Sequence, residues 1–186
     1  MPRDNNKINN LIKNIEPVNI NSDDIPIFKA KEREKLSEYV KQVFDNNREL
    51  EIKDNNRKIL LSKNGAKRTS SKQSPQDKKQ NAVYTKIKEI VERAKYYDFQ
   101  EADEKHKNVK GQEIYYSKIN IDNNPYKVKI VVDVPLDKYL EKGATYNYAG
   151  HRVSKIEIAP VRNTLSVENN TGELKQVLST FILYHA

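Results

Sequence analysis

The feature that most constrains the fold is residues 114–134, which read IYYSKINIDNNPYKVKIVVDV. Their centre, Asp122-Asn123-Asn124-Pro125, consists of residues that favour a tight turn. Beyond the turn, one face would hold Tyr126, Val128, Ile130, Val132 and Val134, and the other Lys127, Lys129, Val131 and Asp133. Because successive side chains of a strand point to opposite faces, this alternation predicts a long antiparallel hairpin with one buried face and one polar face.

Two other segments show helical periodicity. Apolar residues recur at spacings of three and four at Leu36, Tyr39, Val40, Val43 and Phe44. A second helix is predicted to begin at Ser74, a favourable N-cap that precedes Pro75, and to continue to Ala94. Residues 50–61 lie between these helices and are typical of two short strands around a polar turn.

This order of elements predicts an α+β fold, in which two helices pack on one face of a curved antiparallel sheet. Residues 1–24 are rich in Asn and are expected to form a flexible arm, although their isoleucines could dock on the domain. Residues 25–186 are expected to form a single domain. The second face of the sheet would then be free to carry lysines.

Charge and cysteine content narrow the classes of function. Among the 186 residues, 34 Lys and Arg outnumber 26 Asp and Glu, and the formal charge of +8 favours polyanions such as RNA, DNA or an anionic membrane. The absence of cysteine excludes disulfides, thiolate metal sites and cysteine nucleophiles. No stretch is long and apolar enough to cross a bilayer. We therefore expect no membrane association and a cytoplasmic location, with delivery into a target cell as part of a larger protein as the alternative.

Residues 60–75 read LLSKNGAKRTSSKQSP. They gather cations and hydroxyls around the start of the second predicted helix. Backbone amides near a helix start and nearby cations favour phosphate. We therefore interpret Lys63, Lys67, Arg68 and Thr69 as a substrate-binding, phosphate-positioning loop that folds over the sheet. A flexible, solvated loop is the alternative, and the spacing does not match a Walker loop.

Four segments in this order carry a resemblance to a known family: IPIFKAKEREKLSEYVKQVF, RKILLSKNGAKRTSS, EIVERAKYYD and IYYSKINIDNNPYKVKIVVDV. Together they resemble the phage-type branch of the barnase–EndoU–colicin–RelE nuclease-like superfamily, over roughly residues 25–158 by element order. The resemblance implies a barnase/RelE-like α+β fold whose sheet carries a metal-independent ribonuclease site. Because members vary in their catalytic residues, the fold carries over better than the function.

Metal-independent cleavage of RNA requires a base, an acid, and cations that neutralise the phosphorane. We expect His151 to supply proton transfer, because an imidazole titrates near neutral pH, with Arg152 beside it. A surface histidine in a loop is the alternative.

Lys129 is predicted to stabilise the reacting phosphate, and Lys118 and Lys127 are predicted to bind the phosphate backbone of the RNA. The alternative is that these lysines form an ordinary solvated face of the strand. Tyr116 is a candidate proton donor and Tyr146 a candidate for stacking on bases. Strand alternation places half of the tyrosines toward the core, which limits both assignments.

The leading hypothesis is a ribonuclease toxin or effector of a phage or mobile element. It would act on RNA, such as tRNA or mRNA, as a monomer with no metal or cofactor, and an immunity protein or antitoxin would oppose it. The second hypothesis is a catalytically silent nuclease-like domain that binds RNA or a host protein. A third is an inhibitor that blocks a nucleic-acid site.

Overall fold

The computed structural model describes residues 5–104, 108–140 and 150–161. The helices are α1 (Asn5–Lys13), α2 (Arg33–Asn46), α3 (Lys63–Ser71), α4 (Lys78–Thr85), α5 (Ile87–Glu92) and α6 (Asp137–Leu140), with a 3-10 turn η1 (Ser22–Asp24). The strands are β1 (Val18–Ile20), β2 (Glu49–Ile52), β3 (Arg57–Leu60), β4 (Lys95–Glu101), β5 (Val109–Ile121), β6 (Asn124–Pro135) and β7 (Arg152–Pro160).

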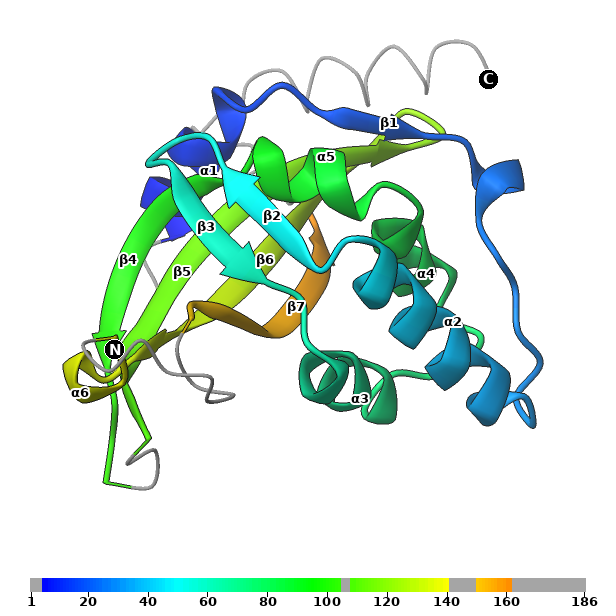
Figure 1. The fold of residues 1–186 in the computed structure, drawn as a ribbon. Coiled ribbons are helices and arrows are strands. Elements are labelled where there is room, and N and C mark those ends of the chain that lie inside the picture. The colour runs from blue at the N-terminus through cyan, green and yellow to red at the C-terminus, as the bar shows by residue number, and fades with distance from the viewer. Residues whose placement is uncertain (1–4, 105–107, 141–149, 162–186) are drawn as a thin grey trace, which may run out of the picture.

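All the strands belong to one strongly curled sheet, in the order β1-β5-β6-β7-β3-β2, with β4 also paired to β5 (Figure 1). Most neighbours are antiparallel, but β1 runs parallel to β5, and β3 meets β7 in parallel at the single pair Leu60 and Arg152. The predicted α+β class with a curved sheet is therefore confirmed. Several helices pack against the sheet rather than two.

The predicted hairpin is the centre of this sheet. β5 and β6 pair antiparallel from Ile121 and Asn124 at the turn to Val109 and Pro135 at the far end. The turn itself is Asp122 and Asn123, with φ of 47° and 67°, the left-handed conformation that Asp and Asn tolerate in a two-residue hairpin. Asn124 already belongs to β6, so the turn is tighter than its four polar residues suggested.

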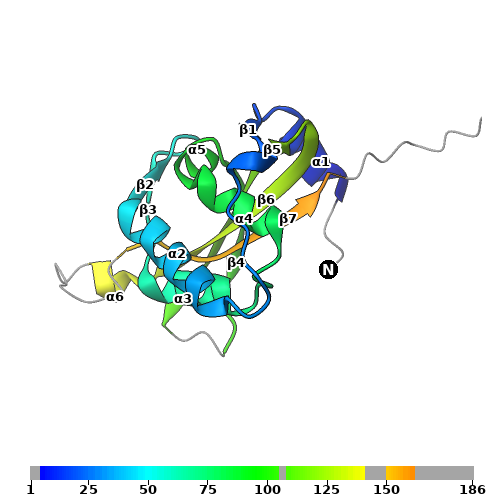
Figure 2. The same ribbon diagram turned by 90° about the vertical axis from the view of Figure 1, so that its right-hand side faces the viewer.

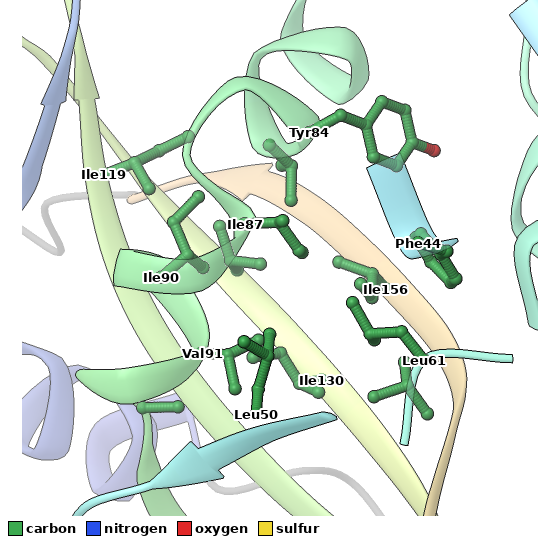
Figure 3. Packing of buried hydrophobic residues seen from close by; sticks show 14 of the residues in the cluster. Phe44, Leu50, Leu61, Tyr84, Ile87, Ile90, Val91, Ile119, Ile130 and Ile156 are labelled. Atoms are coloured by element: carbon green, nitrogen blue, oxygen red, sulfur yellow. The ribbon is translucent and has the colours of Figure 1, made fainter. Parts of the chain in front are cut away.

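The main core lies between the helices and one face of the sheet. Figure 3 shows residues from α4 and α5 lying over Ile119, Ile130 and Ile156 of the sheet, with Phe44 and Leu61 at the side. A register shift opposite Val131 and Val132 places Ser154 in a bulge, so that Val153 and Ile156 both face this core. Burial of each large apolar side chain contributes roughly 1.5–3 kcal/mol, so this cluster supplies most of the stabilisation.

The segment expected to be a phosphate-positioning loop is instead the helix α3. Ser62 caps it by accepting a hydrogen bond from the amide of Gly65 at 3.1 Å. A Cβ on Gly65 would lie 2.6 Å from the Val153 carbonyl oxygen. The glycine therefore permits close approach of α3 to β7 and does not form a tight turn.

The second predicted helix also begins later than expected. Asp77, not Ser74, is its N-cap and accepts a hydrogen bond from the amide of Gln80 at 3.0 Å. The helix is then interrupted at Lys86, which separates α4 from α5. Both pieces, drawn in Figure 2, still contribute apolar residues to the main core, as the buried cluster shows.

Residues 5–24 of the Asn-rich N-terminal segment form α1, β1 and η1, and their isoleucines dock on the domain. Ile8 and Ile12 of α1 are 1% and 2% exposed, and Val18 of β1 is 1% exposed. β1 adds a parallel edge strand to β5. Docking of these apolar side chains orders the segment. The extension of the domain to residue 186 stays a prediction, because residues 162–186 lie outside the described part.

Within the described residues, no helix combines the length and apolarity that a bilayer crossing requires.

Candidate functional site

The second face of the sheet is partly covered, which limits where a site can lie. α1 packs Ile8 and Ile12 against Ile114, Tyr116 and Val131 on the side of the sheet that faces away from the main core. Tyr116 is 3% exposed, and its ring meets that of Tyr97 edge-on, with centroids 5.3 Å apart. We therefore leave Tyr116 out of the candidate site, because a substrate cannot reach a side chain packed beneath α1.

The uncovered part of this outer face borders α3 and forms a cavity of about 940 Å³, which we call the α3 groove. Its lining consists of Arg68, Thr69, Ser71, Lys72, Gln73, Ser74, Asp77, Gln80, Gln100, Gln112, Lys129, Val131, Ser154, Lys155, Ile156 and Glu157. The structure thus brings Arg68 and Thr69 of α3 together with Lys129 of β6. These three residues were predicted from two separate segments of the sequence.

The other predicted phosphate ligands do not line the α3 groove. Lys67 is exposed on α3, and Lys118 and Lys127 form a cross-strand pair on β5 and β6 next to the hairpin turn. Lys63 lines a different cavity of about 540 Å³, together with Arg48 and Arg152. Tyr146 lies outside the described residues. The cations predicted as one binding surface therefore occupy several places.

A second polar cluster lies on the core-facing side of the curled sheet, between β3 and β5. Arg57 of β3 binds Glu113 of β5 through two hydrogen bonds, from Nε to Oε2 at 3.0 Å and from Nη2 to Oε1 at 2.6 Å. The Tyr115 hydroxyl also donates to Glu113 Oε2 at 2.6 Å, and the amide of Asn55 donates to the Tyr115 hydroxyl at 2.9 Å. We call these four residues the Arg57–Glu113 cluster.

His151 lies within the electrostatic influence of this cluster. Burial lowers the pKa of its imidazole, and the positive charge of Arg57 lowers the pKa further, against the opposing effect of Glu113. The backbone carbonyl of His151 accepts a hydrogen bond from the amide of Leu60 at 2.8 Å, which joins the start of β7 to β3. The half-buried imidazole is therefore mostly neutral at pH 7 and available as a proton acceptor.

The tyrosine and arginine of the cluster hold their protons strongly. Burial, and after it the hydrogen bond to the Glu113 carboxylate, raise the pKa of Tyr115 to about 12. Burial lowers the pKa of Arg57, but the combined effects of Glu113 and Tyr115 outweigh burial, so the net pKa is raised. The cluster therefore presents a fixed cation whose charge acts on the neutral imidazole of His151, with a carboxylate that holds the cation in place.

Arg57, Glu113 and Tyr115 were absent from the residues predicted from sequence. One signal could have indicated Glu113. If the alternation of β5 is continued toward its N-terminal end, this carboxylate falls on the same face as the buried Tyr115. An acid on the apolar face of a strand requires a partner. The partner, Arg57, is 56 residues away in sequence and is not indicated by any local pattern.

Metal binding has no visible basis in the part of the chain that the structure describes, where no three His, Asp or Glu side chains gather closely enough to hold an ion.

One comparison with known proteins gives a match. A family model described as large polyvalent protein-associated domain 3 matches residues 29–143, which is more than half of the chain. The matched region runs from just before α2 into the residues that follow α6, and it contains Arg57, Glu113 and Tyr115 but not α1 or β7. No curated protein and no solved structure matches the chain.

Proposed function

The chain belongs to the large polyvalent protein-associated domain 3 family, and from this premise we propose that it is a metal-independent ribonuclease of a phage or mobile element. The observation that supports cleavage is a half-buried imidazole, His151, whose pKa is lowered by burial and by the positive charge of the fixed Arg57 guanidinium of the Arg57–Glu113 cluster. Residues that exchange protons near neutral pH and lie beside a fixed cation are typical of catalytic sites.

In the proposed reaction, neutral His151 accepts the proton of a ribose 2′-hydroxyl. The 2′-oxygen forms a bond to the adjacent phosphorus, the bond from phosphorus to the 5′-oxygen breaks, and that oxygen takes a proton from water. The products are a 2′,3′-cyclic phosphate and a free 5′-hydroxyl. Arg57 stabilises the added negative charge on the phosphorane, and Glu113 is a positioning residue that orients Arg57.

The test is incubation of purified protein with total RNA in the presence of a chelator. We expect discrete products that end in cyclic phosphate. His151→Gln should lower the cleavage rate by about 100-fold or more, because the general base is lost. Arg57→Gln should have a comparable effect, whereas Lys58→Gln, an exposed neighbour on the same strand, should cleave at the wild-type rate.

Two further measurements keep this test decisive. Thermal unfolding of each variant shows whether a lost activity reflects a lost fold. Added imidazole should partly restore cleavage to His151→Ala, since a free base can replace the missing side chain. RNA that stays intact with the wild-type protein, or a His151→Gln variant that cleaves normally, contradicts the proposed reaction.

One observation favours a second candidate, a silent domain that binds RNA without cleaving it. The Glu113 carboxylate already accepts three hydrogen bonds, from two nitrogens of Arg57 and from Tyr115, which is also how a purely structural buried acid is satisfied. In that case the same incubation should leave RNA intact while a gel-shift experiment detects a complex.

For the cellular role, we take the domain to act as a toxin or effector, opposed by an immunity protein or antitoxin. The charge of +8 supports an acidic opposing partner. Growth arrest on expression, relieved by His151→Gln, supports this role.

A further inference from the structure

We propose that the α3 groove binds the phosphodiester backbone of a single-stranded nucleic acid, independently of cleavage at the Arg57–Glu113 cluster. This inference goes beyond the proposed ribonuclease, since it concerns the opposite face of the sheet. The groove is lined by residues of α3, the loop that follows it, the start of α4, and strands β4 to β7.

Charge is the first argument. Arg68, Lys72, Lys129 and Lys155 line the groove, against two carboxylates, those of Asp77 and Glu157. Both carboxylates are engaged within the protein. Asp77 caps α4, and Glu157 pairs with Lys155 at 2.5 Å. Four cations outnumber two carboxylates, so the lining as a whole is basic even with Lys155 paired to Glu157. Cations concentrated in a hollow attract phosphates more strongly than the same cations on a flat surface.

Thr69 supplies an independent argument. Its side chain lines the groove although the residue is only 8% exposed, and within the described residues its Oγ1 has no hydrogen-bond partner. A buried hydroxyl without a partner lowers stability, so its presence requires an explanation. The hydroxyl oxygen itself is covered in this conformation, so a phosphate oxygen bound in the groove would accept its hydrogen bond once the Thr69 side chain turns toward the groove.

The character of the lining favours the backbone over the bases. No aromatic side chain is among the described residues that line the groove, so it offers no surface on which bases could stack. Its polar residues are cations, hydroxyls and glutamine amides, which donate hydrogen bonds to phosphate and sugar oxygens. Binding should therefore be insensitive to sequence and sensitive to salt.

The test is the affinity of the full chain for a dye-labelled oligodeoxythymidylate of about twelve nucleotides, measured by fluorescence anisotropy over a range of salt concentrations. This probe has no 2′-hydroxyl and cannot be cleaved by the proposed reaction. Arg68→Gln and Lys129→Gln should each weaken binding about fivefold or more. Each should also reduce the slope of log affinity against log salt by about 0.7, the value for one phosphate contact on a single strand.

Matched controls lie next to both residues. Lys67→Gln on α3 and Lys127→Gln on β6 remove the same charge outside the groove and should change affinity by no more than about twofold. Equal losses in all four variants, or tighter binding of a duplex of the same length, would overturn the groove assignment, because either result indicates diffuse surface charge.

Thr69→Val separates binding from structure. It removes the hydroxyl at nearly constant volume, so the unfolding temperature should stay constant or rise, while affinity should fall about fivefold. An unchanged affinity overturns the role assigned to the hydroxyl and with it the site. His151→Gln should bind the probe like the wild type, so failure of the ribonuclease proposal and failure of this inference are distinguishable.

Discussion

At the scale of single residues, buried polar groups decide how the helices are held. Asn81 of α4 is fully buried and connects three segments. Its Nδ2 donates to the carbonyl oxygens of Pro26 at 3.0 Å and Pro75 at 3.3 Å, and its Oδ1 accepts from Gln73 Nε2 at 2.5 Å. Gln73 in turn accepts from the Tyr84 hydroxyl at 2.7 Å. The network fixes the loop between α3 and α4, and with it one wall of the α3 groove.

We predict that Asn81→Ala lowers the free energy of unfolding by about 3 kcal/mol, because it leaves an amide and two carbonyl groups without partners. Urea denaturation measures this change. Asn46 is exposed near the end of α2, so the free energy of unfolding of Asn46→Ala should stay within about 0.5 kcal/mol of the wild-type value. A loss of similar size in both variants would mean that the Asn81 network does not stabilise the fold.

At the scale of elements, α1 covers part of the outer face of the sheet, whereas α3 packs beside β7 and contributes Ala66 to the main core. α1 covers Ile114, Tyr116 and Val131 through a small apolar cluster of its own, separate from the main core. α3 lies beside β7 (Figure 1), and the residues that line the α3 groove include members of both. α1 therefore depends on few contacts, and its local stability should be lower than that of the central strands.

We predict that Ile12→Asp releases α1 without unfolding the domain, because a charge cannot remain in this cluster. Amide hydrogen exchange should then accelerate in α1, while the amides of β5 and β6 keep their protection. Asn10→Asp, on the exposed side of the same helix, should leave exchange unchanged. Loss of protection in β6 as well would show that α1 belongs to the cooperative core.

At the scale of the whole molecule, ionisation of His151 is linked to global unfolding. The folded protein holds the pKa of this imidazole below its ordinary value of 6.5 by burial and by the charge of Arg57. The unfolded chain therefore binds the proton more readily. The contribution of neutral His151 to the free energy of unfolding is complete above pH 6.5. It is lost as the pH falls below that value toward the lowered pKa of His151 in the folded protein.

We predict that the unfolding temperature of the wild type falls as the pH is lowered from about 7.5 to about 5.5. The unfolding temperature of His151→Gln should fall less over the same pH range. Calorimetry of both proteins measures the difference. Asp122, whose pKa is lowered by hydrogen bonds from Ser22, titrates at lower pH and does not contribute here. Parallel curves for the two proteins would contradict the linkage.

Much of the fold could be predicted because its signals are local. The alternation in residues 114–134 indicated β5 and β6, and the periodicity of Leu36, Val40 and Phe44 indicated α2. The start of α4 and the helical state of α3 were missed. The residues of α3 were taken as a loop because Gly65 and several hydroxyl residues have low helix preference, whereas packing against β7 and capping by Ser62 stabilise a helix there. The start of α4 was placed too early, at Ser74, whereas Asp77 caps the helix.

The candidate site was predicted less completely. Arg68, Thr69 and Lys129 do lie in one groove, because the hairpin alternation correctly placed Lys129 on the outer face. Tyr116 shares that face but lies beneath α1, a helix in a segment expected to be flexible. Contacts made by a distant helix leave no trace in the alternation of the strand they cover.

The sequence by itself determined the strands of the central hairpin, the face each of its residues occupies, and the basic balance of the chain, because these depend on neighbouring residues and on composition. Only the tertiary structure decided which polar groups meet. The curl of the sheet brings Arg57 to Glu113 and leaves a hollow between α3 and Lys129. The physical reason is that strand curvature and helix docking arise from packing of the whole core, which no local pattern of residues encodes.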